Sequence, residues 1–250
     1  MNPLWKYLPE DSPISGKKKK LKIEGKQLSS LPPEVFGLEA LQVLEMSPER
    51  ESCLSFQMGL VPREIGLLRN LTVLYMDSNS LKAIPPEIGS LENLQRLTLS
   101  NNFLASLPVE LARLQKLRSL HLANNCLTDL PAPVCQLKKL TFLDASDNQL
   151  ETLPESIKNL KRLGTLLLLF NSLEKLPESF CRLRRLRSLW LGYNRLRRLP
   201  SGFGNLENLD WGRSHCSCNF EGNPLECPPE EVCRQGPERI KQYFESWKLM

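Results

Sequence analysis

A repeat of fixed length constrains the fold of this chain more than any other feature. Six consecutive 23-residue blocks, from Leu71 to Asn208, follow the pattern LxxLxLxxNxLxxLPxxIxxLxx without slippage. The asparagines recur at one offset, as Asn79, Asn102, Asn125, Asn148, Asn171 and Asn194. One such block is too short to bury its own leucines and needs neighbours to complete a core. The period therefore predicts a solenoid.

The block that starts at Leu94 shows what each repeat is expected to form. Leu97 and Leu99 alternate with polar residues, which is typical of a half-buried strand. Asn102 follows at the turn, where its amide can pair with backbone groups, and stacked repeats would place these amides in a ladder. Leu111 and Leu114, spaced by three after Pro108, favour a short helical or 3₁₀ piece on the opposite side. The predicted fold class is thus α/β, a solenoid with a concave parallel sheet and a short helical or 3₁₀ convex side.

The flanking regions depart from the regular pattern and suggest domain limits. We expect an N-terminal tail or cap over residues 1–20, the solenoid over 21–225 and a capping segment with a short helix over 226–250. Irregular repeats cover 21–70 and 209–225 on either side of the regular ones, which run from 71 to 208. Extra residues fall within 47–59, and a second irregular segment spans 211–217.

The residues Leu-x-x-Leu-x-Leu-x-x-Asn-x-Leu resemble the leucine-rich-repeat family over most of the chain, from about 21 to 247. The repeat length and the LPxxI motif are similar to the typical intracellular subclass of Ras-suppressor-like, Scribble- and Erbin-like and plant Ras-group-related proteins. The resemblance implies a right-handed solenoid and a non-catalytic scaffold or adaptor for protein partners. It also implies small-GTPase, kinase or phosphatase signalling as the setting.

Large apolar side chains gather at outward strand positions in the C-terminal half, where the alternation predicts that they are exposed. An exposed apolar patch usually marks an interface, and Trp and Tyr are common anchors. In the alternative, Phe170 and Tyr193 tuck into the turn, or the segment 209–221 folds over the patch. The predicted partner-binding residues on the concave face are Tyr75, His121, Phe142, Asp144, Leu167, Leu169, Phe170, Trp190 and Tyr193.

A second feature with the same period is basic. Residues just before each repeat's first leucine would stack into a ridge, here called the basic ridge: Lys116, Lys138, Lys139, Lys161, Arg162, Arg184 and Arg185. Other arginines, Arg187 among them, thicken it. An acidic or phosphorylated segment or an anionic membrane surface would complement this charge. The alternative is a solvated edge balanced by nearby glutamates such as Glu151, Glu155, Glu174 and Glu178. The ridge lacks interleaved aromatic residues, which disfavours nucleic acid.

The remaining signals argue against membrane spanning and catalysis. No apolar run approaches the ~20 residues of a membrane span, and the first 15 residues lack a secretory core. We therefore expect a cytoplasmic protein with reduced cysteines, although Lys17–Lys20 leaves a nuclear alternative. A secreted domain stapled through Cys216, Cys218, Cys227 and Cys233 is a further alternative, and their C-x-C spacing disfavours zinc. His121 and Asp144 have no accompanying nucleophile, so no enzyme, cofactor or metal is expected.

Overall fold

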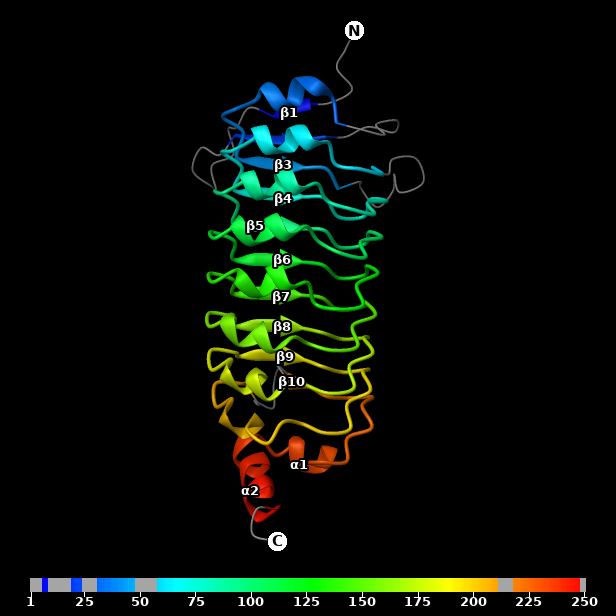
Figure 1. Cartoon of the computed structure of the whole chain (residues 1–250), viewed down its shortest axis with the longest axis vertical. Helices are drawn as coiled ribbons and strands as arrows, with labels where there is room; N and C mark the ends of the chain where they lie inside the picture. Colours follow the sequence, from blue (N-terminus) through cyan, green and yellow to red (C-terminus); the bar gives the residue numbers. More distant parts are fainter. Residues whose placement is uncertain (1–5, 9–18, 24–30, 48–57, 211–217, 248–250) are drawn as a thin grey trace. The chain divides into compact units, whose positions relative to one another are not determined.

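The computed structural model describes residues 6–8, 19–23, 31–47, 58–210 and 218–247 (Figure 1). The chain divides into two compact units, Met1–Cys126 and Leu127–Met250. Each unit is described by itself. The two sequence segments at 48–57 and 211–217, and with them most of both predicted insertions, lie outside the described residues.

The first unit is a stack of short strands that follow one another in sequence order. Strand β1 (Lys6–Leu8) pairs antiparallel with β2, and from β2 onward each strand pairs in parallel with the next. The strand register places equivalent leucines side by side. Leu74 pairs with Leu97, and Leu97 pairs with Leu120. The strands are β2 (Lys20–Lys22), β3 (Val43–Glu45), β4 (Val73–Tyr75), β5 (Arg96–Thr98) and β6 (Ser119–His121).

The second unit repeats this arrangement. Its strands pair in parallel in the order β7, β8, β9 and β10. Leu143, Leu166 and Leu189 occupy one row across the first three of them. The bounds are β7 (Phe142–Asp144), β8 (Thr165–Leu167), β9 (Ser188–Trp190) and β10 (Cys218–Asn219).

The side opposite the strands consists of 3₁₀ turns, as the leucine spacing predicts. All but η9 (Phe203–Asn205) begin directly after a proline, and the proline carbonyl accepts the first i to i+3 bond, as in Ile88 N–H to Pro85 O at 3.1 Å. A following leucine closes the turn, as Leu91 N–H does on Ile88 O at 3.1 Å. These turns are η1 (Pro33–Gly37), η3 (Arg63–Leu67), η4 (Pro86–Ser90), η5 (Val109–Arg113), η6 (Ala132–Gln136), η7 (Glu155–Asn159), η8 (Glu178–Arg182) and η9 (Phe203–Asn205).

The core lies between the strands and the 3₁₀ turns and is made of the periodic leucines. Leu97, Leu99 and Leu111 of one repeat are fully buried, and the equivalent residues of the other regular repeats are buried as well. Burying one leucine side chain contributes roughly 1.5–3 kcal/mol. Every repeat contributes the same set, so the core continues through each unit.

The repeated asparagines form the predicted ladder. Asn171 accepts a hydrogen bond from Leu150 N–H at 2.9 Å and donates to Ala145 O at 3.0 Å. Asn102 does the same in the first unit, accepting from Leu81 N–H at 3.0 Å and donating to Met76 O at 3.0 Å. Each buried amide thus satisfies backbone groups of its own repeat and of the one before, which ties consecutive repeats together.

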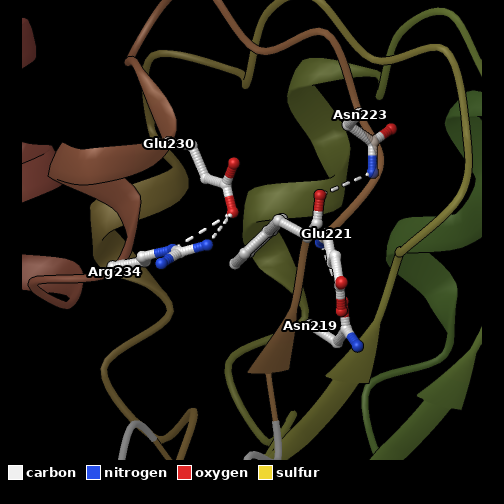
Figure 2. A network of polar contacts seen from close by, with 6 residues as sticks. Asn219, Glu221, Asn223, Glu230 and Arg234 are labelled. Carbon is white, nitrogen blue, oxygen red and sulfur yellow. Dashed lines mark hydrogen bonds and ion pairs between the residues drawn. The ribbon is translucent and has the colours of Figure 1, made fainter.

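The irregular repeats rejoin the ladder after their extra residues. Asn79 donates to Met46 O at 3.0 Å, and this hydrogen bond joins the first regular repeat to the longer repeat before it. At the other end Asn223 accepts from Leu196 N–H at 3.0 Å and donates to Leu191 O at 2.8 Å. Asn223 therefore occupies the regular ladder position, although it comes later in the sequence than the 23-residue spacing would place it. Figure 2 shows Glu221 between Asn223 and Asn219, and the Glu221 N–H donates to Asn219 Oδ1 at 2.8 Å.

Two helices follow the last repeat of the second unit. Helix α1 (Glu230–Cys233) is fixed by an Arg234–Glu230 ion pair at 2.8 Å (Figure 2). Helix α2 (Pro237–Trp247) buries Ile240 and lies within the segment 226–250, for which a short helix was expected. It lies directly on Gly204, where an added Cβ would be 2.8 Å from Pro237 O and 2.8 Å from Lys241 Cβ. The described helices therefore end the stack as a cap should, while the predicted domain limits stay a prediction.

Candidate partner-binding face

The residue before each ladder asparagine has the same unusual backbone conformation. Its φ lies between 52° and 58° in all six regular repeats, in the left-handed region that non-glycine residues rarely adopt. Its N–H is fixed in the backbone ladder, as for Asp147 N–H to Leu169 O at 2.8 Å. Ser, Asn and Asp occupy the position in four repeats, and Asn and Asp tolerate this conformation better than most residues. In order, the residues are Ser78, Asn101, Asn124, Asp147, Phe170 and Tyr193.

Two of these six positions carry aromatic rings instead. Phe170 and Tyr193 stack face to face, with ring centroids 4.6 Å apart and an interplanar angle of 10°. The Tyr193 ring also lies over Gly222, where an added Cβ would be 2.7 Å from Tyr193 Cδ1. Gly222 is the equivalent position of the next repeat and also has a positive φ of 72°. The stack is therefore Phe170, Tyr193 and then the bare backbone of Gly222.

The stacked rings remain open to solvent. Phe170 is 53% exposed, Tyr193 45% and Trp190 36%. Leu167 is half-buried beside Trp190 in the strand register. We call Leu167, Phe170, Trp190 and Tyr193 the aromatic patch. The alternative in which the two rings tuck into the turn is not what the structure has, and the segment expected to fold over them lies partly outside the described residues.

The other predicted partner-binding residues are less exposed than the strand alternation suggested. Phe142, Asp144 and Leu169 in the second unit are half-buried. Leu169 is covered because its Cδ2 lies against Gly192, 3.1 Å from where a Cβ would be. Asp144 accepts a hydrogen bond from Ser146 N–H at 3.0 Å. The exposed apolar surface of this face is therefore formed mainly by the rings of Phe170, Trp190 and Tyr193.

In the first unit, the corresponding face is polar and its groups pair with one another. Asp77 accepts from Ser100 N–H at 2.8 Å and from the Thr98 hydroxyl, which leaves Thr98 buried although the alternation places it outward. Asn124 donates to Asn101 Oδ1 at 2.9 Å in the row that holds the aromatic rings elsewhere. Tyr75 and His121 are half-buried.

His121 has a hydrogen-bond partner on its own strand. Its Nε2 lies 2.8 Å from Ser119 Oγ, and Ser119 is buried. Asp144, its predicted neighbour, belongs to the other unit. Within the residues that the structure describes, no group of three His, Cys, Asp or Glu side chains could hold a metal ion. Cys216 of the predicted cysteine cluster lies outside them.

The residues of the basic ridge are all exposed. Lys116 in the first unit donates to Asn93 Oδ1 at 2.7 Å. Among the described residues, no ion pair joins the ridge to Glu151, Glu155, Glu174 or Glu178, so the proposed balance by nearby glutamates is not formed as direct pairs. Glu178 instead accepts from Ser201 N–H at 3.2 Å.

One part of the ridge is hollowed, which the sequence did not reveal. An open pocket of about 380 Å³ is lined by Thr141, Arg162, Gly164, Arg185, Arg187 and Asn208. Arg162 and Arg185 are predicted ridge residues, and Arg187 is one of the arginines that thicken the ridge. Gly164 supplies the space, because the same position holds Thr, Gln or Arg in the other regular repeats. That exception among the repeats was the available sequence signal.

Burial affects the chemistry of several thiols in the second unit. Burial, with a smaller contribution from the nearby Glu230 carboxylate, raises the pKa of the Cys233 thiol to about 12. Burial also raises the pKa of Cys181 to about 12, helped by Glu178. Thiols with such raised pKa values are poor nucleophiles at neutral pH.

Sequence profiles of one repeat class match much of the chain. A profile described as leucine-rich repeat matches residues 69–127 and 92–150, and one described as leucine-rich repeat region matches residues 132–219. No protein in the curated collection searched matches significantly. Within the described residues, no helix has the length and apolarity to cross a bilayer.

Solved structures share the fold. A leucine-rich-repeat protein of Leptospira interrogans is 33% identical with a TM-score of 0.74, over 86% of this chain and 58% of its own. The plant peptide hormone receptor RGFR1, solved in complex with RGF2, is 27% identical with a TM-score of 0.65, over 85% of this chain and 32% of its own.

A third similar structure is also a receptor complex. The ectodomain of the receptor kinase GASSHO1/SCHENGEN3 from Arabidopsis thaliana, in complex with CASPARIAN STRIP INTEGRITY FACTOR 2, is 28% identical with a TM-score of 0.67. The match covers 78% of this chain and 23% of the ectodomain chain. This chain thus spans less than two thirds of the length of each of these three structures.

Proposed function

The chain belongs to the leucine-rich-repeat family, and we propose that it is an intracellular, non-catalytic scaffold that binds a protein partner through the aromatic patch of its second unit. Leucine-rich-repeat proteins are typically non-catalytic, and the fold commonly mediates protein–protein interaction. Two of the similar structures are receptor complexes with RGF2 and with CASPARIAN STRIP INTEGRITY FACTOR 2, which supports a protein or peptide as partner.

The observation that carries the proposal is the placement of Phe170 and Tyr193. A bulky residue with φ near 55° costs on the order of 1 kcal/mol that Asn or Asp would largely avoid. Both rings are also substantially exposed, so core packing does not explain them. Backbone strain together with exposed apolar surface is a combination found at functional sites.

Partner capture by matched variants tests the proposal. The Phe170→Asn/Tyr193→Asn double variant replaces the rings with the residue that Asn101 and Asn124 already provide at the same turn position. It removes the aromatic surface while keeping a residue suited to the backbone. The control is Phe103→Ser, which removes a ring that is 54% exposed in the first unit and installs the residue found at the equivalent Ser80 and Ser172.

We expect proteins enriched from cytosol by the wild-type chain and by Phe103→Ser to be lost from the double variant, with circular dichroism and melting unchanged. Truncating an aromatic anchor commonly weakens binding by about 2 kcal/mol or more, which is roughly thirtyfold. Equal capture by all three chains, or no capture beyond that of the double variant, would refute binding through the patch.

The setting of this interaction is part of the proposal and rests on the resemblance in sequence. The repeat length and the LPxxI motif support an intracellular signalling protein whose partner is a small GTPase, a kinase or a phosphatase. Identification of the prey that depends on the aromatic patch would decide among these classes.

A further inference from the structure

We propose that the pocket of Arg162, Arg185 and Arg187 binds a phosphorylated side chain of the protein partner. This inference rests on the proposed function, since it names the chemistry of the segment that the second unit binds. It adds a defined anion site to the apolar contact made by the aromatic patch.

The pocket gathers positive charge without neutralising it. Three of its six lining residues are arginines, and none of the six is a carboxylate. Among the described residues, no carboxylate forms an ion pair with Arg162, Arg185 or Arg187. Neighbouring like charges repel one another, so a bound anion would stabilise the cluster. Two acidic residues flank the pocket residue Asn208 in the sequence, Glu207 and Asp210. The Asp210 N–H donates to Arg187 O at 2.8 Å.

The backbone register holds the arginines around one space. Gly164 N–H donates to Thr141 O at 2.8 Å, and Arg187 N–H donates to Gly164 O at 2.8 Å, which sets the three residues side by side in neighbouring repeats. Asn208 Nδ2 donates to Arg184 O at 2.6 Å and fixes the turn that carries Arg185. A Cβ on Gly164 would meet only Thr141 O at 3.6 Å and Arg185 O at 4.0 Å, so the space beside it is open.

Guanidinium groups favour phosphate among the available anions. Each arginine presents a planar set of donors that pairs with two oxygens of one group, and a phosphomonoester offers three acceptor oxygens with nearly two negative charges. A single carboxylate supplies half of that charge. Thr141 is part of the same lining.

The position of the pocket favours a peptide over a lipid headgroup. The pocket lies just before strands β7, β8 and β9, while Leu167 and Trp190 lie at the far ends of β8 and β9. Arg187 and Trp190 are three residues apart in an extended segment, or roughly 10 Å. An extended peptide spans this distance in about three residues. One segment can therefore place a phosphate in the pocket and an apolar side chain on the aromatic patch.

Direct binding to phosphopeptides tests the pocket. The full chain would be presented with a fluorescent degenerate peptide library fixed only at a central phosphoserine, phosphothreonine or phosphotyrosine, and with the unphosphorylated library. We expect capture of phosphorylated peptides that carry an apolar residue about three positions away, and dissociation constants that rise with salt.

Three variants separate the pocket from its surroundings. Arg162→Gln/Arg185→Gln/Arg187→Gln should weaken phosphopeptide binding by about tenfold or more, because hydrogen bonds to a charged group are lost. Gly164→Leu fills the space at constant charge and should weaken binding similarly. Lys82→Gln/Lys175→Gln/Lys241→Gln removes the same number of exposed charges outside the pocket lining and the basic ridge, and it should change binding by less than about threefold. Melting curves establish that each variant is folded.

The outcomes distinguish the possible sources of phosphate. Equal weakening by the arginine and lysine variants would overturn the pocket in favour of diffuse charge. Binding to phosphatidylcholine vesicles that contain phosphatidylinositol phosphates, without phosphopeptide binding, would overturn the peptide in favour of a lipid headgroup. Lack of any phosphopeptide preference, with prey still lost from Phe170→Asn/Tyr193→Asn, would refute this inference and leave the proposed function standing.

Discussion

The sheet faces of the two units differ although their backbones repeat. In the first unit, Asn101 and Asn124 bond to each other at the left-handed turn position, and Asp77 pairs with its polar neighbours. In the second unit, Phe170 and Tyr193 occupy the same turn position with φ values that differ from those of the asparagines by a few degrees at most. The polar groups named on the first face are hydrogen-bonded to one another, whereas the second face exposes aromatic rings that the fold does not require. The difference locates the proposed partner site in the second unit.

The buried asparagines test whether the scaffold really is equivalent in the two units. We expect Asn102→Ala in the first unit and Asn171→Ala in the second each to lower the free energy of unfolding by about 3 kcal/mol, because buried backbone groups lose their partners. Urea unfolding would measure both. The exposed Asn159→Ala should cost under about 0.5 kcal/mol. A loss confined to one unit would show that the ladder does not stabilise both alike.

The turn residues test whether the rings serve structure or binding. Asn124→Tyr should destabilise the first unit by about 1–2 kcal/mol, because a bulky residue is placed in the left-handed region. Tyr193→Asn relieves that strain but loses a stacked ring contact of about 1 kcal/mol, so its net change should stay within about 1 kcal/mol. Thermal melting compares the two. A large loss in Tyr193→Asn would mean that the aromatic pair is structural, and the comparison between the faces would lose its functional meaning.

Alkaline pH should affect the second unit through its buried thiols. The pKa of Cys233 is raised to about 12 in the folded chain, whereas an unperturbed thiol titrates near 8.5. The native state therefore holds this proton more tightly. The resulting stability is fully present below about pH 8.5 and is lost as the pH rises toward 12.

The expected effect, unlike those of the preceding substitutions, is restricted to alkaline pH. The unfolding midpoint of the wild-type chain should fall more between pH 8 and pH 10 than that of Cys233→Ala, which lacks the titrating group. An identical decline in both chains would show that other groups cause the alkaline loss. Cys135 and Cys181, whose pKa values burial also raises, would be the next to replace.

Much of the scaffold was predictable because repetition removes ambiguity. A period of 23 residues fixes which leucines share a row in the core. A position that is buried in one repeat is therefore expected to be buried in the next. The strands, the 3₁₀ turns and the asparagine ladder all followed from that spacing, whereas Asn223 joins the ladder six residues later than the spacing places it. The exposure of individual side chains was less predictable. The strand alternation places Thr98 and Ser119 on the outer face, but both side chains are buried. Leu169 is covered by its contact with Gly192.

By itself the sequence determined the repeat, the core rows and the presence of aromatic and basic residues outside the core, because hydrophobic spacing dictates which side chains a solenoid buries. The tertiary structure decided which of the others meet. The stack of Phe170 and Tyr193 depends on their rare φ and on the bare backbone of Gly222. The arginine pocket depends on register, which brings Arg162, Arg185 and Arg187 from different repeats around the space left by Gly164. The aromatic stack and the arginine pocket both form between neighbouring repeats. Their shapes depend on side chains at positions that the repeat pattern does not specify.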